Sequence, residues 1–211
     1  QVSTTAYGSW TTTFTITTQA YGTTTITGTD LQYGIMATQT LVITPNIILV
    51  SPREGTVGSL VTVCGNGYGA TEDIHIHFGT TRTITTTSTD AFGSFTTTFS
   101  IDTQGLGTTT IIAVGINTGQ VASTFTYRIT PRLVLVTPDK GTVGTVVTLS
   151  GGGYQANELV RIDFGITRTI TMVSAQAEGS FTVTFTIDTQ RYGTTTIYAT
   201  GVVSGGVASN L

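Results

Sequence analysis

Two histidines alternate along one expected strand, where they could together bind a metal ion. His75 and His77 are two residues apart in the segment 74–78, so both side chains lie on the same face of a β-strand. A zinc site would need further nitrogen or sulfur ligands around them. A second copy of this segment carries Arg161 and Asp163 at the same two positions. We therefore interpret this face as the polar side of a strand and expect no metal there.

Acidic residues in the middle of the chain could in principle bind calcium, which requires several converging oxygen ligands. Glu54, Glu72 and Asp73 lie in the central copy of the repeat. In the next copy, Glu54 is replaced by Lys140 and Asp73 by Leu159. A calcium site common to the copies is therefore not expected, and the sequence predicts no cofactor.

The sequence shows no catalytic pattern. It has no Ser/His/Asp order and no nucleophile elbow. The glycine-rich segment 65–69 joins two expected strands and opens no helix, unlike a phosphate-binding loop. Asp102 and Asp188 begin Asp-Thr-Gln turns, where aspartate is a common turn residue. Cys64 is the only cysteine, and Ser150 takes its place in the next copy. We expect no enzymatic activity.

Three aromatic residues are candidates for contacts with a sugar or another protein. Trp10 aligns with Phe95 and Phe181 at an inward-facing strand position, which predicts a core residue. Tyr21 and Tyr192 lie in turns where the middle copy has a leucine. We therefore name Tyr21 and Tyr192 as the candidate interface or ligand contacts.

The chain is built from repeated units. Gly65, Gly67 and Tyr68 reappear 86 residues later as Gly151, Gly153 and Tyr154. A fixed period of this kind marks an array of similar modules, and a unit of this length can enclose its own core. The sequence predicts the second half of a module over 1–44, a complete module over 45–130 and a module lacking its last strand over 131–211.

Apolar and polar residues alternate along most of the chain, a pattern typical of half-buried strands. Turn residues separate the expected strands, and no helical period appears. Seven short strands per module predict an all-β fold of immunoglobulin-like β-sandwiches. Short proline-containing joints between modules favour a stiff rod, with about 40 Å per module. The strands expected in the complete module are Ile47–Ser51, Leu60–Cys64, Asp73–Phe78, Arg82–Ser88, Phe95–Ile101, Thr108–Gly115 and Val121–Thr130.

The segment 133–154 resembles the opening of Ig-like repeats of the IPT/TIG kind. It carries their Pro…Gly…Gly-Thr pattern followed by Gly-x-Gly and an aromatic residue. The later Gly-Ser-Phe-Thr and Gly-Thr-Thr-Thr-Ile segments are similar to modules in large surface proteins of bacteria and archaea. The resemblance implies an extracellular, cell-surface setting and roles as spacers, adhesive stalks or structural subunits. It implies no catalytic residues.

The amino-acid composition limits the kinds of binding partner that we expect. Only 9% of residues are charged and the net charge is −3, whereas threonine supplies 52 of 211 positions. A nucleic-acid-binding surface is therefore not expected. No apolar run is long enough to cross a bilayer as a helix, so membrane insertion is not expected either.

The expected modules at the two ends are incomplete, which allows two explanations. The chain could be a window from a longer repetitive polypeptide, which we favour, or separate subunits could complete one another by adding strands. The leading hypothesis is a structural repeat unit of an extracellular filament, sheath or surface layer that self-associates as a homopolymer. The alternatives are stalk or tip modules of an adhesin that binds glycans or another cell, and accessory domains of a secreted polysaccharide-degrading enzyme.

Overall fold

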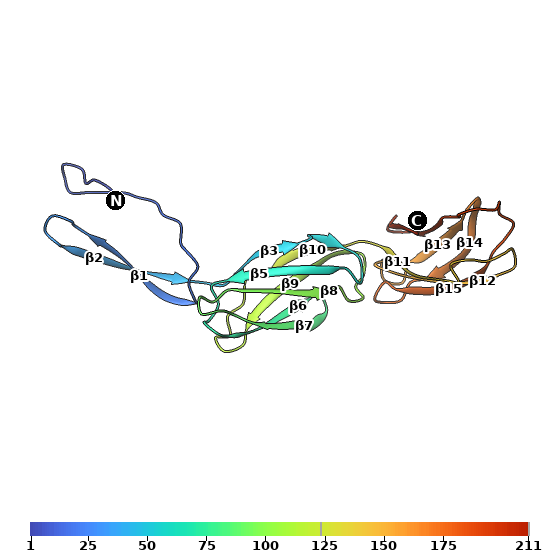
Figure 1. Cartoon of the computed structure of the whole chain (residues 1–211), viewed down its shortest axis with the longest axis horizontal. Coiled ribbons are helices and arrows are strands. Elements are labelled where there is room, and N and C mark those ends of the chain that lie inside the picture. The colour runs from blue at the N-terminus through green and yellow to red at the C-terminus, as the bar shows by residue number, and fades with distance from the viewer. Residues whose placement is uncertain (123, 211) are drawn as a thin grey trace.

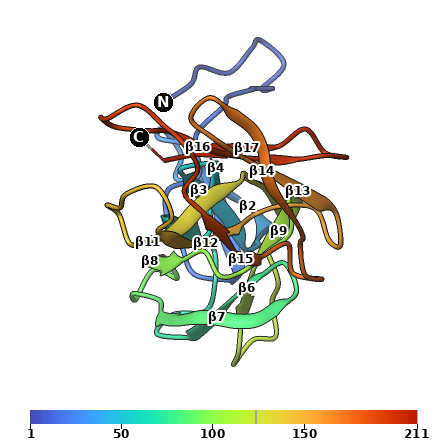
Figure 2. The same ribbon diagram turned by 90° about the vertical axis from the view of Figure 1, so that its right-hand side faces the viewer.

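The computed structural model describes residues 1–122 and 124–210. Among these residues every regular element is a β-strand, which confirms the predicted all-β fold. The molecule is elongated, with its three parts in a row from the N-terminal arm to the last sandwich (Figure 1). Seen from the end of the row, the third part lies in front of the second (Figure 2). The described residues contain no helix with the length and apolar character needed to span a membrane.

We name the parts module 1 (residues 1–44), module 2 (45–130) and module 3 (131–210). The strands of module 1 are β1 (Gly22–Thr29) and β2 (Met36–Ile43). Those of module 2 are β3 (Asn46–Ser51), β4 (Glu54–Gly55), β5 (Leu60–Asn66), β6 (Asp73–Phe78), β7 (Thr81–Ser88), β8 (Phe95–Ser100), β9 (Gly107–Gly115) and β10 (Phe125–Ile129). Those of module 3 are β11 (Arg132–Thr137), β12 (Val146–Gly152), β13 (Leu159–Phe164), β14 (Thr167–Ser174), β15 (Phe181–Thr186), β16 (Ile197–Gly201) and β17 (Val207–Ser209).

Module 2 is a sandwich of two sheets with strand orders β3-β5-β8 and β4-β10-β9-β6-β7. Alternate residues of each strand point inward, and the rings of Phe78, Phe99 and Tyr127 pack together in the core. The last strand, β10, pairs antiparallel with β9 and parallel with β4. The expected strand Val121–Thr130 is shorter in the structure, because Val121 makes only an isolated bridge to Val114.

Module 3 repeats this arrangement with the orders β11-β12-β15 and β14-β13-β16-β17. The register repeats as well: the bulge between Ile47 and Leu49 has its counterpart between Leu133 and Leu135. Residues 140–141, which correspond to β4, form no strand, and the positions that correspond to β10 begin at 211, outside the described residues. β16 begins at Ile197, whereas its counterpart β9 begins at Gly107.

Module 1 differs from the prediction. The strand in which Trp10 was expected does not form, and residues 1–20 make no ladder with another described strand. The interpretation of Trp10 as a core residue is wrong: its side chain is 49% exposed. The physical reason is that a strand of the β8 kind needs a β5-like neighbour, and none of the described residues supplies one. We call residues 1–20 the arm.

Candidate functional site

The two histidines that first suggested a metal site lie on one strand of module 2. Within the described part of the chain, no group of three or more histidine, cysteine or acidic residues could hold a metal ion. His75 and His77 lie half-buried on the polar face of β6. Burial lowers the pKa of His77, and the nearby charges of Arg82 and His75 lower it further. The residues that the fold does bring together lie at the joints between modules.

The same backbone hydrogen bond occurs at both joints. Between modules 1 and 2, the amide of Tyr21 donates to the carbonyl of Tyr68 over 2.7 Å. Between modules 2 and 3, the amide of Leu106 donates to the carbonyl of Tyr154 over 2.9 Å. We call the turn that contains Tyr21 or Leu106 the docking turn. We call the loop of the next module that contains Tyr68 or Tyr154 the receiving loop. The two modules therefore contact each other directly at a repeated point.

In each receiving module, a glycine in the turn after β7 or β14 lies where the docking turn approaches. Gly93 and Gly179 adopt φ angles of 73° and 76°, which few other residues tolerate. A Cβ atom on Gly93 would lie 2.9 Å from Cα of Ala20, and one on Gly179 would lie 3.0 Å from Cα of Gly105. The nearest clash, at 2.0 Å, would be with the carbonyl oxygen of Tyr68 or Tyr154 in the same module, so glycine is required at both positions, and the neighbouring module adds a second close contact.

In modules 2 and 3, hydrogen bonds among an aspartate and a glutamine of the docking turn and a threonine of a neighbouring strand hold the turn in place. In module 2, Asp102 accepts a short hydrogen bond from the hydroxyl of Thr81 and a 2.9 Å bond from Nε2 of Gln104. In module 3, Asp188 accepts a short bond from Thr167 and a 2.7 Å bond from Gln190. These bonds connect the turn to the neighbouring strand and lower the pKa of Asp188. These bonds lie within one module, so they hold the turn independently of the neighbouring module.

A buried glutamate holds the receiving loop from the other side. Glu72 is 1% exposed and accepts hydrogen bonds from the amides of Gly69 (2.7 Å) and Thr118 (2.5 Å) and from the Thr118 hydroxyl (2.7 Å). Gly69 directly follows Tyr68, whose carbonyl forms the joint. The carboxylate therefore connects two loops and positions the acceptor of the joint.

The same arrangement recurs in module 3. Glu158 is 4% exposed and accepts bonds from the amides of Gln155 (2.6 Å) and Ser204 (3.0 Å) and from the Ser204 hydroxyl (2.8 Å). Burial raises the pKa of each glutamate, but the hydrogen bonds outweigh burial and the net pKa is lowered. Sequence reasoning missed this pair, although Glu72 and Glu158 are separated by the repeat spacing of 86 residues.

The joint between modules 2 and 3 has further contacts. Nη1 of Arg132 lies 3.4 Å from the carbonyl of Val57, at hydrogen-bonding distance. The backbone of Gly206 lies against Pro131 and Leu106, so that a Cβ atom there would be 2.8 Å from Cγ of Pro131. At this joint, therefore, side chains near Pro131 and from both modules make contacts in addition to the backbone hydrogen bond.

The two predicted contact residues occupy equivalent docking turns. Tyr21 is 37% exposed and its amide forms the first joint. The Tyr192 side chain is fully exposed. Beside Tyr192 is a groove of about 760 Å³, lined by Val136, Val147, Phe164, Ile187, Gln190 and Ile197 among others.

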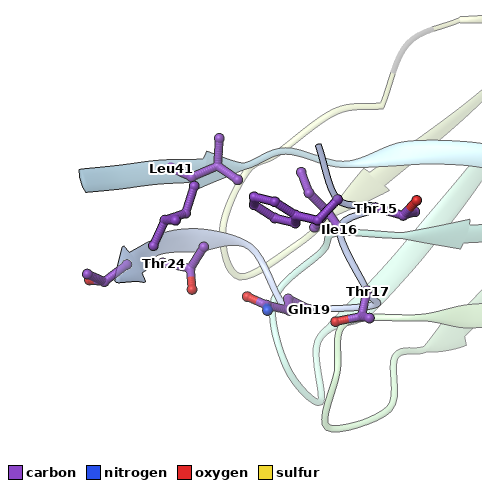
Figure 3. Close-up of a pocket in the computed structure, with 9 residues that line it drawn as sticks. Thr15, Ile16, Thr17, Gln19, Thr24 and Leu41 are labelled. Carbon is purple, nitrogen blue, oxygen red and sulfur yellow. The ribbon is translucent and has the colours of Figure 1, made fainter. Parts of the chain in front are cut away.

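A smaller cavity of about 320 Å³ lies in module 1 between the arm and the β1–β2 hairpin. Phe14 and Ile16 of the arm line one side, and Ile26 and Leu41 of the hairpin line the other. Figure 3 shows Ile16 and Leu41 on opposite sides of this space, with Thr17 and Gln19 at its edge. Phe14 and Ile16 remain 61% and 50% exposed, so this part of the molecule has apolar side chains without a closed core.

Comparison with known proteins gives distant structural similarity only. No family model and no curated protein matches the sequence. The tetra-tandem repeat in the extending region of a large adhesion protein is 13% identical with a TM-score of 0.38, over 90% of this chain and 55% of that one. The D0-D1 domain of intimin is 10% identical with a TM-score of 0.30, over 77% and 95%.

A third similar structure is SGBP-B of the Bacteroides ovatus mixed-linkage glucan utilization locus, in complex with a heptasaccharide. It is 17% identical with a TM-score of 0.32, over 90% of this chain and 49% of that one. The BSP domain of a biofilm-associated protein is 16% identical with a TM-score of 0.28, and this chain spans 28% of its length. The structures in this comparison include Ig-like and adhesin repeat domains. The finer resemblance to IPT/TIG repeats stays a prediction.

Proposed function

We propose that this chain is a non-enzymatic structural array that acts outside the cell as part of a filament, sheath or surface layer. The observation that carries the proposal is the repeated joint. The same amide-to-carbonyl bond and the same close approach to a glycine connect module 1 to 2 and module 2 to 3. Modules joined by one recurring contact stack in one direction, and such head-to-tail contacts build open filaments when they continue between molecules.

Electron microscopy of the purified chain tests this proposal. We expect fibres whose axial repeat is a multiple of one module, about 40 Å from strands of about seven residues and their end loops. Fibres should lengthen with protein concentration. A chain that stays monomeric at all concentrations, with modules that reorient freely about Pro131, would contradict the proposal.

A second candidate is an adhesin stalk that binds glycans, and the exposed tyrosines favour it. The rings of Tyr7, Tyr33 and Tyr192 are 96%, 73% and fully exposed. Exposed aromatic rings can stack on the apolar faces of sugars. Binding to a glycan array that is lost in Tyr192→Ala, with folding unchanged, would favour this candidate over a purely structural role.

A further inference from the structure

The three side chains that hold each docking turn are also the groups that an acyl transfer requires. In module 3, the hydroxyl of Thr167 donates a short hydrogen bond to Oδ2 of Asp188, so a carboxylate is placed to accept its proton. The carboxamide of Gln190 lies beside the same hydroxyl, with Nε2 3.2 Å from Oγ1 of Thr167. A hydroxyl, a base and a carbonyl carbon therefore meet at one point.

The aspartate also orients the glutamine. An ionised carboxylate only accepts hydrogen bonds, so Oδ1 of Asp188 faces the NH₂ group of Gln190, at 2.7 Å from Nε2. The hydrogen bonds from Thr167 and Gln190 lower the pKa of Asp188, which keeps its carboxylate ionised. The carboxamide oxygen lies 3.3 Å from the amide nitrogen of Ile166. This N–H group can stabilise the negative charge that forms on the oxygen when an alcohol adds to the carbon.

Module 2 has the same arrangement. The hydroxyl of Thr81 donates a short hydrogen bond to Oδ2 of Asp102. Nε2 of Gln104 lies 2.9 Å from Oδ1 of Asp102 and 3.4 Å from Oγ1 of Thr81. Gln104 is only 7% exposed, so bulk water is largely kept from its carboxamide. The geometry is therefore a feature of the module rather than of one copy.

A glycine in each copy makes room for the carboxamide. A Cβ atom on Gly79 would lie 2.5 Å from Oε1 of Gln104, and one on Gly165 would clash in the same way with Oε1 of Gln190. Both glycines have positive φ angles, 55° and 57°. The backbone of the β6–β7 or β13–β14 turn thus packs directly against the glutamine side chain and limits where the carboxamide can move.

We propose that Thr81 joins Gln104, and Thr167 joins Gln190, through an intramolecular ester bond. Oγ1 of the threonine attacks Cδ of the glutamine while the aspartate takes the hydroxyl proton. The Cδ–Nε2 bond then breaks, and the aspartate passes the proton to Nε2, which leaves as ammonia. One C–O bond forms and one C–N bond is lost, so no oxidant, reductant or cofactor is needed. Each site reacts once and acts on no external substrate.

The ester would fix the docking turn covalently to the first residue of β7 or β14. In module 2 this is the turn whose Leu106 amide bonds to the next module. The cross-link would therefore hold the turn in the geometry of the joint even when its hydrogen bonds open. This inference does not rest on the proposed function, because the bond lies within one module.

Tryptic peptides of the full chain test the proposal without any substitution. Trypsin cuts after arginine, and Arg168 separates Thr167 from Gln190. We expect peptides 162–168 and 169–191 as one branched species, lighter than their sum by one ammonia, about 17 Da. Thr167 is the only residue with a hydroxyl group in peptide 162–168, which fixes the linked position. Mild hydroxylamine, which cleaves esters, should release the two peptides.

Module 2 gives a second, independent measurement. Trypsin also separates Thr81 from Gln104, so peptides 54–82 and 83–128 should be joined in the same way. Cyclisation of Gln1 at the N-terminus would also release ammonia, but it joins no two peptides. The branched species, rather than the mass of the whole chain, is therefore the readout.

Matched variants of module 2 assign the roles, and module 3 of the same molecule is the internal control. Thr81→Val removes the attacking oxygen. Asp102→Asn removes the base, which should slow ester formation by about 100-fold or more. In both variants the branched species of module 2 should be lost while that of module 3 remains. Thr103→Val changes an exposed side chain in the same turn and should leave both species unchanged.

Two results from the unsubstituted chain would overturn the proposal. One is separate peptides with unchanged glutamines. The other is conversion of Gln190 to glutamate, about 1 Da heavier, because water and not the threonine would then have attacked the carboxamide. A branched species that forms equally well in Asp102→Asn would overturn the role of the aspartate. Fibre formation bears on the filament proposal alone, so the two proposals can fail separately.

Discussion

Replacing Glu72 by glutamine should weaken both module 2 and its joint with module 1. The carboxylate accepts three bonds of 2.5–2.7 Å from Gly69 and Thr118 inside the protein. Glutamine keeps one acceptor oxygen but places an NH₂ group opposite an N–H donor. One charge-assisted hydrogen bond is lost, and one buried donor is left without a partner. Each effect costs roughly 1–3 kcal/mol, so we expect a loss of about 3 kcal/mol in the free energy of unfolding.

Urea unfolding measures this loss. With an m-value of about 2 kcal/mol/M, the midpoint should fall by about 1.5 M. Hydrogen exchange provides a second readout at the joint. The loop that carries the Tyr68 carbonyl would no longer be held through Gly69, so the amide of Tyr21 should exchange faster.

The matched control is Glu54→Gln. Glu54 pairs with Arg128 at 3.6 Å, but both side chains are more than 60% exposed, so the change should stay within about 0.5 kcal/mol. Equal losses in the Glu72 and Glu54 variants would refute the role of the buried carboxylate. A large loss in Glu72→Gln with unchanged protection of the Tyr21 amide would show that Glu72 stabilises the module but not the joint.

Three further predictions concern pH, the joint and the core. Folding lowers the pKa of Glu72 and of Glu158. The two carboxylates therefore stabilise the folded modules above the ordinary pKa of 4.5, and this contribution is lost as the pH falls through the folded pKa. Unfolding experiments between pH 6 and 2 should show the loss. Leu106→Pro removes the amide that bonds to module 3, about 1 kcal/mol, and should increase interdomain motion in NMR relaxation, whereas Tyr192→Pro in the equivalent free turn should not. Tyr127→Phe should be neutral or slightly stabilising in urea unfolding, because the hydroxyl has no partner in the described structure; a loss above about 1 kcal/mol would contradict this.

Much of the fold could be predicted because it depends on local patterns in the sequence. Period-two alternation located most strands of modules 2 and 3, and turn residues marked their ends. The repeat spacing made each position in one copy a check on the other: His75 and His77 align with Arg161 and Asp163, which indicated the polar face of a strand, and both histidines lie half-buried on that face of β6. These features depend on residues close in sequence, so no knowledge of packing was needed.

The arm shows where local pattern failed. Its alternation is as regular as that of β8, yet it forms no strand and leaves Trp10 half exposed. A strand needs a hydrogen-bonding neighbour, and none of the described strands pairs with the arm. Alternation of apolar and polar residues indicates which face of a strand is apolar. Whether that face is buried depends on whether another layer of the protein covers it.

The sequence by itself predicted the all-β fold and most strands of modules 2 and 3, because alternation and turn chemistry are properties of neighbouring residues. Only the tertiary structure revealed the joint. The bond from Leu106 to Tyr154 and the buried position of Glu158 depend on loops that are distant in sequence and meet at the end of a sandwich. A backbone carbonyl has no sequence signature. The contact between modules could therefore be located only from the positions of the two loops in the structure.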